Sequence, residues 1–192
     1  MRFFFLRHTS LNVDQDIFYG QTNLDVSDKF EYELEKIRIK INNNIPNFKN
    51  IDIFSSPLMR CKKLAYGISE NINFDDRLKE LDLGDWEMKP KNQIPKKFIE
   101  EWENNIMTFH IPNGESNKDF IKRLKSFIDE KSKLEKDLLI VAHAGSINGM
   151  ISILTSQPFN KLLKKYWEKI GYGSLSLVEF RDSLFKIKYV GK

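Results

Sequence analysis

Cysteine is almost absent from this chain of 192 residues, and the single one, Cys61, has no partner for an internal disulfide bond. This excludes a disulfide-stapled fold and favours a reducing compartment. No apolar run reaches the length of a membrane-spanning helix, and the apolar start ends after Leu6, too early for the core of a secretory signal. We therefore expect a cytoplasmic protein with no membrane partner.

The sequence also lacks a long block of charges of one sign. Its 31 basic and 27 acidic residues give a formal net charge of +4. This mild excess suits a small anionic substrate and gives little support to nucleic-acid binding. The length favours one domain, residues 1–192, and leaves the choice between monomer and homodimer open.

Several phosphate-binding and metal-binding motifs are missing. There is no G-x-x-x-x-G-K-[ST] loop, and three histidines with one cysteine give no zinc spacing. Asp14-Gln15-Asp16 has the D-x-D form of aspartate-nucleophile phosphatases but follows a polar loop, not an apolar strand. Gly67 stands six residues after Cys61, where a cysteine phosphatase needs arginine. We therefore expect no metal and no cofactor.

Two of the three histidines follow short apolar runs. The run Phe3–Leu6 is followed by Arg7 and His8, and the run Leu138–Ala142 is followed by His143. Such runs are typical of buried parallel strands, and ligands of open α/β sheets bind beyond the carboxyl ends of the strands. We therefore expect both imidazoles to face one crevice.

Strands and helices alternate along the rest of the pattern, which predicts a three-layer α/β/α fold with a mostly parallel mixed sheet. Prolines and weak periodicity over about residues 86–115 indicate a small inserted helical cap. Residues 174–180 and 184–190 are expected to form a hairpin. The helix expected from Ala144 to Leu154 would offer free backbone N–H groups near Gly145 to an anion.

Ser27 and Ser56 are among the serines expected to cap helices. Ser27 precedes apolar residues at helical spacing, and Ser56 precedes Pro57, a residue favoured at the first helical position. The second start places Arg60 in the first turn of its helix.

Together these residues suit phosphoryl chemistry. The guanidinium groups of Arg7 and Arg60 could hold phosphoryl oxygens, a protonated histidine could add a third charge, and a neutral histidine can attack phosphorus. A proton donor to the leaving oxygen is also needed. Glu80 is the best candidate, although Asp82, Asp85 and Glu87 lie nearby.

Four segments, in this order, resemble the motifs of the histidine phosphatase superfamily, which has the phosphoglycerate-mutase-like fold: Arg7-His8, Ser55–Cys61, Leu78–Trp86 and Val141–Gly145. The resemblance covers nearly the whole chain. Within the superfamily the chain is most similar to α-ribazole phosphatases, through Tyr19–Thr22, Leu81–Met88 and Pro112–Ser116.

The resemblance implies a metal-independent phosphomonoesterase in which His8 becomes a phosphohistidine and Glu80 serves first as acid and then as base. The residues expected to contact the phosphoryl group or the rest of the substrate are Arg7, Arg60, His143, Ala144, Gly20 and Tyr19. The implied substrate is α-ribazole 5′-phosphate of cobalamin synthesis. Alternatives are a phosphoglycerate mutase, a broad sugar or nucleotide phosphatase, and a non-catalytic phosphate-binding protein.

The chain departs from the family pattern at some positions. Thr9 stands where glycine is frequent, and the phosphate-contacting asparagine of many members has no assigned counterpart near Asn12 or Asp14. His110 is expected on the cap surface. The aromatic residues Trp86, Trp102, Tyr19 and Tyr172 could line the site or simply pack.

Overall fold

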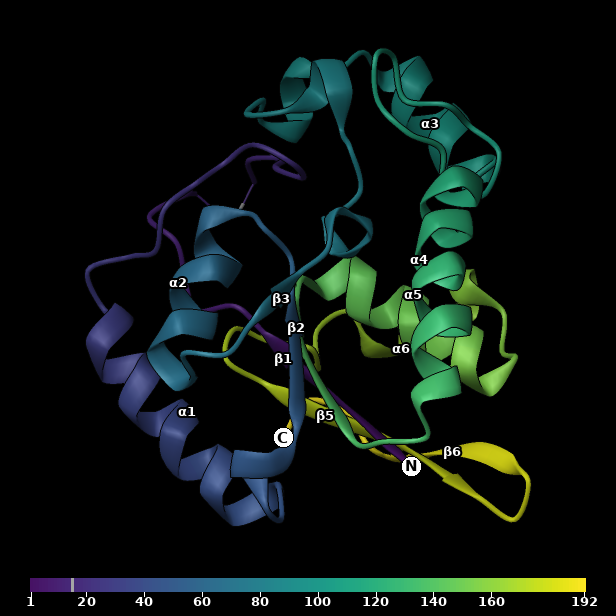
Figure 1. Ribbon diagram of the computed structural model, residues 1–192. Coiled ribbons are helices and arrows are strands. Elements are labelled where there is room, and N and C mark those ends of the chain that lie inside the picture. The colour runs from purple at the N-terminus through teal and green to yellow at the C-terminus, as the bar shows by residue number, and fades with distance from the viewer. Residues whose placement is uncertain (15) are drawn as a thin grey trace.

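A mixed sheet forms the centre of the fold in the computed structural model, which describes residues 1–14 and 16–192; Gln15, in the middle of the D-x-D segment, lies outside them (Figure 1). Within the described residues the order of its six strands is β3-β2-β4-β1-β5-β6. Their bounds are β1 Arg2–Arg7, β2 Asp52–Ser55, β3 Asn73–Phe74, β4 Leu138–Ala142, β5 Leu175–Arg181 and β6 Leu184–Tyr189. This confirms the predicted α/β class.

The four strands β1 to β4 pair in parallel, and β5 and β6 add an antiparallel edge. In the pairing of β1 with β4, Arg7 lies opposite Ala142. The residues that follow, His8 and His143, therefore leave the sheet side by side, as the two apolar runs predicted.

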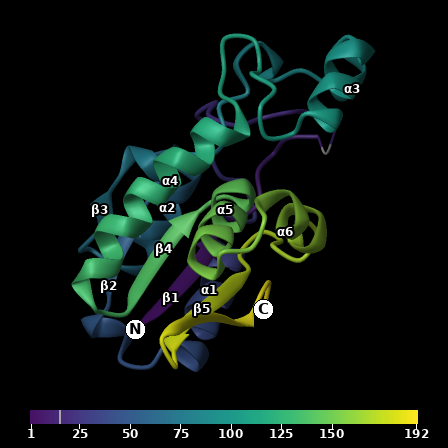
Figure 2. The same cartoon turned by 90° about the vertical axis from the view of Figure 1, so that its right-hand side faces the viewer.

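Helices cover both faces of the sheet, and Figure 2 shows α4 and α5 in front of it with α1 behind. On one face lie α1 (Phe30–Asn44) and α2 (Met59–Ile68), and on the other lie α4 (Asn117–Lys131), α5 (Ala144–Thr155) and α6 (Phe159–Tyr166). Among the described residues, no helix is both long and apolar enough to cross a membrane.

The alternating direction of side chains along β1 explains why the fold has two apolar layers. Successive side chains of a strand point to opposite faces. Phe3 and Phe5 accordingly join the core of α4 and α5, while Phe4 and Leu6 join the core of α1 and α2, and all four are fully buried.

Short 3₁₀ helices connect the larger elements. In the described part of the chain they are η1 Phe48–Asn50, η2 Asp76–Leu78, η3 Gly84–Trp86, η4 Lys91–Gln93 and η5 Ser132–Leu134.

The segment of residues 86–115 contains α3 (Lys96–Asn104) and lies beyond one end of the sheet (Figure 1). Together with Leu83 it forms a small apolar cluster. Trp86 is buried there, with ring centroids 5.9 Å from Trp102 and 5.8 Å from Phe109. Both tryptophans therefore pack within the segment. Its role as a cap stays a prediction.

The expected cap at Ser27 is wrong, since α1 begins one residue after Lys29 without a side-chain cap. The Ser27 hydroxyl instead lies 2.7 Å from the Ser10 hydroxyl and accepts a 3.3 Å hydrogen bond from the Lys29 amide. A tertiary partner thus holds this serine in a turn before the helix.

The expected start at Ser56 and Pro57 is also wrong, because Leu58 is the residue before α2 and the helix begins at Met59. Arg60 still lies in the first turn, as predicted.

The predicted hairpin of β5 and β6 is confirmed. Asp182 and Ser183 form its turn, with backbone angles in the left-handed region (φ 53° and 62°).

Candidate active site

His8 and His143 lie together beyond the carboxyl ends of β1 and β4. Both are 1% exposed, and their ring centroids are 5.2 Å apart. His8 follows β1 directly, and His143 is the residue from which α5 begins. The structure therefore brings the two histidines into one buried site.

The backbone fixes the tautomer of His8. Its Nδ1 lies 2.8 Å from the carbonyl oxygen of Thr9, which can only accept, so Nδ1 carries the proton. Burial, followed by the charges of Arg7 and Arg60, lowers the pKa of His8 well below 6.5. The ring is thus neutral, and the lone pair on Nε2 is available for a nucleophilic attack.

His143 has the opposite tautomer. The Nε–H of Arg60 donates to Nδ1 at 3.1 Å, so Nε2 carries the proton and donates to the Ser56 hydroxyl at 2.9 Å. Burial, followed by the charge of Arg60, holds the pKa of His143 well below 6.5. A protonated histidine as a third charge, which the sequence suggested, stays a prediction.

Arg60 is fully buried, and backbone carbonyls orient it. Besides His143, its guanidinium donates to the carbonyl oxygens of Thr22, at 2.8 Å, and Gly20. Gly20 therefore lies at the site, with its carbonyl directed at Arg60.

Glu87 holds the loop that carries these carbonyls. Its carboxylate accepts hydrogen bonds from the amides of Gly20, Gln21 and Thr22 and from the Thr22 hydroxyl, the last at 2.6 Å. Burial acts to raise the pKa of Glu87, but these hydrogen bonds outweigh burial and lower it. An ionised Glu87 thus fixes the partners of Arg60.

Arg7 contacts an aromatic ring. Its guanidinium lies 4.1 Å from the ring centroid of Tyr172 and donates to the Ile170 carbonyl at 2.8 Å, while its buried Nε has no hydrogen-bond partner. The Tyr172 hydroxyl lies 2.6 Å from that of Tyr19. These two tyrosines line the site, in contrast to Trp86 and Trp102.

Two cations at this site have no anionic partner. Among the residues that the structure describes, neither Arg7 nor Arg60 forms an ion pair with a carboxylate. Holding positive charge away from water without compensation is costly. The arrangement is therefore suited to an anion that accepts from both guanidinium groups.

The carboxylate of Glu80 lies beside the first turn of α5. One carboxylate oxygen accepts from the Gly145 amide at 2.8 Å, and the other accepts from the Leu81 amide at 3.0 Å. The Gly145 amide is therefore not free for an anion, because Glu80 occupies it, and anion binding by the other N–H groups of this turn stays a prediction. Ala144, also buried, is the first residue of α5.

The other candidate residues are either exposed or buried in a packing role. Asn12, Asp14 and His110 are exposed. Cys61 is buried with its Sγ 3.5 Å from His143 Nε2, and burial raises the pKa of its thiol to about 12. Within the described residues, no group of three or more acidic, histidine or cysteine side chains could hold a metal ion.

Sequence reasoning missed two side chains that organise the site. The sequence predicts only a helix cap at Ser56, whose hydroxyl accepts from His143, and it offers Glu87 only as an alternative acid. Both lie in motif segments, so the segments pointed to them but their partners could not be derived.

Comparisons with known proteins identify the family of this chain. Residues 3–192 match the family model of the histidine phosphatase superfamily (branch 1). The protein is thus an enzyme of the phosphatase class, and the chain belongs to the histidine phosphatase superfamily.

The individual relatives share at most 29% sequence identity with this chain in the comparisons below. The chain is 29% identical over 145 residues, 71% of each protein, to "Putative phosphoserine phosphatase 2" of Hydrogenobacter thermophilus. The crystal structure of the alpha-ribazole phosphatase from Shigella flexneri superposes with a TM-score of 0.85 at 20% identity, covering 100% of this chain and 96% of that one. The structure of a mycobacterial glucosyl-3-phosphoglycerate phosphatase superposes with a TM-score of 0.78 at 21% identity, covering 97% of this chain and 96% of that one. These structural similarities establish the fold.

Proposed function

We propose that this protein hydrolyses phosphomonoesters without a metal, through a phosphohistidine at His8. The observation that carries the proposal is the free lone pair on His8 Nε2, buried beside Arg7 and Arg60, two cations without anionic partners in the described structure. Attack on a phosphate needs a neutral nucleophile and charge neutralisation, and these groups supply both.

In the first step, Nε2 of His8 forms a bond to phosphorus while the bond from phosphorus to the leaving oxygen breaks. Glu80, in its protonated form, gives its proton to that oxygen, so the product leaves as an alcohol. Arg7 and Arg60 bind the non-bridging oxygens. The Nε2–H of His143 can exchange its hydrogen bond to Ser56 for one to a phosphoryl oxygen.

In the second step, the Glu80 carboxylate takes a proton from water as the water oxygen attacks phosphorus. The phosphorus–nitrogen bond breaks, its electron pair returns to His8 Nε2, and inorganic phosphate leaves. Glu80 is then protonated again, and the cycle is closed.

For the substrate we propose α-ribazole 5′-phosphate, which is consistent with a cytoplasmic enzyme of cobalamin synthesis. Support comes from the segments Tyr19–Thr22, Leu81–Met88 and Pro112–Ser116 and from the aromatic rings of Tyr19 and Tyr172 at the site. Phosphoserine is the second candidate, because the relative from Hydrogenobacter thermophilus carries that name.

The test is phosphate release from a panel of α-ribazole 5′-phosphate, phosphoserine, nucleotides, sugar phosphates and 3-phosphoglycerate. We expect the highest kcat/KM with α-ribazole 5′-phosphate and no release with His8→Ala. A higher kcat/KM with phosphoserine would show that phosphoserine, and not α-ribazole 5′-phosphate, is the preferred substrate. Isomerisation of 3-phosphoglycerate with a bisphosphoglycerate primer and without phosphate release would instead identify a mutase.

A further inference from the structure

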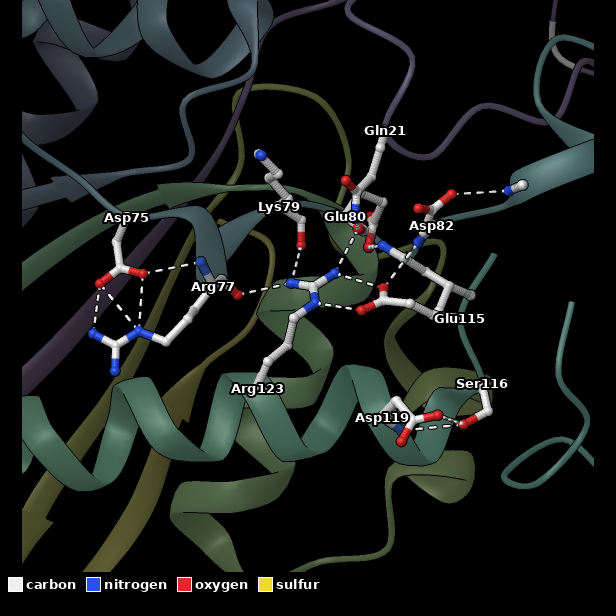
Figure 3. A network of polar contacts seen from close by, with 12 residues as sticks. Gln21, Asp75, Arg77, Lys79, Glu80, Asp82, Glu115, Ser116, Asp119 and Arg123 are labelled. Carbon is white, nitrogen blue, oxygen red and sulfur yellow. Dashed lines mark hydrogen bonds and ion pairs between the residues drawn. The ribbon is translucent and has the colours of Figure 1, made fainter. Parts of the chain in front are cut away.

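One arginine outside the site binds the segment that carries Glu80. Arg123, on α4, donates from one terminal nitrogen to the carbonyl oxygens of Arg77, at 2.8 Å, and Lys79, at 2.7 Å (Figure 3). Its other terminal nitrogen donates at 2.7 Å to the backbone carbonyl of Glu80. Three carbonyls of one segment thus converge on a single guanidinium group.

Glu115 completes this arrangement. Its carboxylate accepts from Arg123 Nε at 2.7 Å and from Nη2 at 2.9 Å, and it also accepts from the Asp82 amide at 3.0 Å. The Arg123 and Glu115 side chains are 19% and 21% exposed. An arginine has five N–H donors, and all five are used here.

The segment needs such partners because residues 79–83 belong to no helix or strand. Buried backbone groups outside regular structure must be satisfied by side chains or water. Arg123 and Glu115 therefore bind the backbone on both sides of Glu80, while the Gly145 and Leu81 amides bind its carboxylate. The position of the carboxylate depends on both sets of contacts.

We propose that Arg123 and Glu115 are positioning residues for Glu80: they hold its backbone so that its carboxylate reaches the leaving oxygen and the attacking water. This inference rests on the proposed acid–base role of Glu80. Within the described residues, neither side chain has a hydrogen bond to His8 or His143. A lysine at position 123 has one ammonium group and cannot span three carbonyls and a carboxylate.

The two catalytic steps make this role measurable with p-nitrophenyl phosphate. Nitrophenolate is a good leaving group and leaves without protonation, so the first step tolerates a misplaced acid, whereas the second step still needs a base. We expect Arg123→Lys to retain the pre-steady-state burst within about twofold. Steady-state turnover should fall about tenfold or more, because small misplacements of a catalytic group are costly, and phosphoenzyme should accumulate.

An alkyl phosphate provides the complementary measurement. Its leaving alkoxide needs the proton, so Arg123→Lys should slow phosphoenzyme formation itself about tenfold or more. Glu115→Gln should change both measurements in the same direction, and it carries the test if Arg123→Lys does not fold.

Arg77→Lys is the matched control. Its side chain lies on the same segment but pairs with Asp75 and Glu130 instead of the backbone around Glu80. Equal effects of Arg123→Lys and Arg77→Lys, or a parallel loss of burst and turnover in folded Arg123→Lys, would overturn the proposed positioning role.

Glu80→Gln separates this inference from the proposed function. It should retain the burst with nitrophenyl phosphate and lose turnover more strongly than Arg123→Lys. If Glu80→Gln leaves turnover unchanged, the acid–base role itself is wrong. If Glu80→Gln behaves as expected and Arg123→Lys matches wild type, only the positioning role is wrong.

Discussion

The carboxylate of Glu80 accepts a hydrogen bond from the Gly145 amide at a point where a larger residue has no room. A Cβ on residue 145 would lie 2.4 Å from Glu80 Oε1 and 3.0 Å from its Cδ. The absence of a side chain at position 145 therefore lets Glu80 approach the first turn of α5.

Gly145→Ala should consequently lower activity without lowering stability. The added methyl group displaces the Glu80 carboxylate, while alanine favours the helix by up to about 1 kcal/mol relative to glycine. We expect turnover of an alkyl phosphate to fall by about tenfold or more, with an unchanged or higher midpoint of urea unfolding.

Gly171→Ala is the control for that variant, because a Cβ there would meet nothing within 4 Å. It should keep wild-type turnover. Wild-type activity in Gly145→Ala would show that Glu80 does not need this position.

The two site histidines should be neutral with opposite tautomers. The pKa values of both lie well below 6.5, so each ring stays neutral at pH values where an exposed imidazole is already protonated. Nitrogen-15 NMR of the ring nitrogens can test this, with only three histidines to assign. We expect the proton on Nδ1 of His8 and on Nε2 of His143 in neutral buffer.

The same pKa shift sets the acid side of the activity profile. His8 attacks only when neutral, so kcat/KM should begin to fall only below pH 6.5, after allowing for the ionisation of the substrate phosphate. An imidazolium signal from His8 at neutral pH would contradict the assigned nucleophile.

Glu87→Gln should weaken substrate binding through Arg60. A carboxamide has one acceptor oxygen and cannot replace a carboxylate that binds four amides and a hydroxyl, so the loop carrying Gly20 and Thr22 should shift. We expect KM to rise several-fold and the free energy of unfolding to fall by about 1–3 kcal/mol. Glu70→Gln, at an exposed glutamate, should change neither.

The lowered pKa of Glu87 also gives the sign of its pH dependence. Its contribution to stability is present above its ordinary pKa of 4.5 and is lost as the pH falls through the lower folded-state value. The difference in free energy of unfolding between wild type and Glu87→Gln should therefore become smaller in strong acid. If this difference is the same at all pH values, the charge of Glu87 does not contribute to stability.

The sequence was sufficient for the sheet and the histidines because both depend on local patterns. Apolar runs determine buried strands, and the register of β1 with β4 then places His8 beside His143. The motif order supplied Arg60 and Glu80 in the same way.

The partners of irregular segments could not be derived. Ser27 and Ser56 have the local pattern of helix caps, but their hydroxyls bind Ser10 and His143, which are distant in the sequence. Arg123 is 43 positions from Glu80 and lies on a helix with no motif. Hydrogen-bond partners of loops depend on tertiary packing, which local spacing does not encode.

Trapping the phosphoenzyme tests the central claim most directly. Wild-type protein is mixed with p-nitrophenyl phosphate, quenched in alkali, where phosphohistidine survives, and digested for mass spectrometry. We expect one phosphoryl group on the peptide that contains His8, lost after acid treatment, absent from His8→Ala and retained in His110→Ala. Turnover with no adduct, or with the phosphoryl group on another residue, would contradict the account.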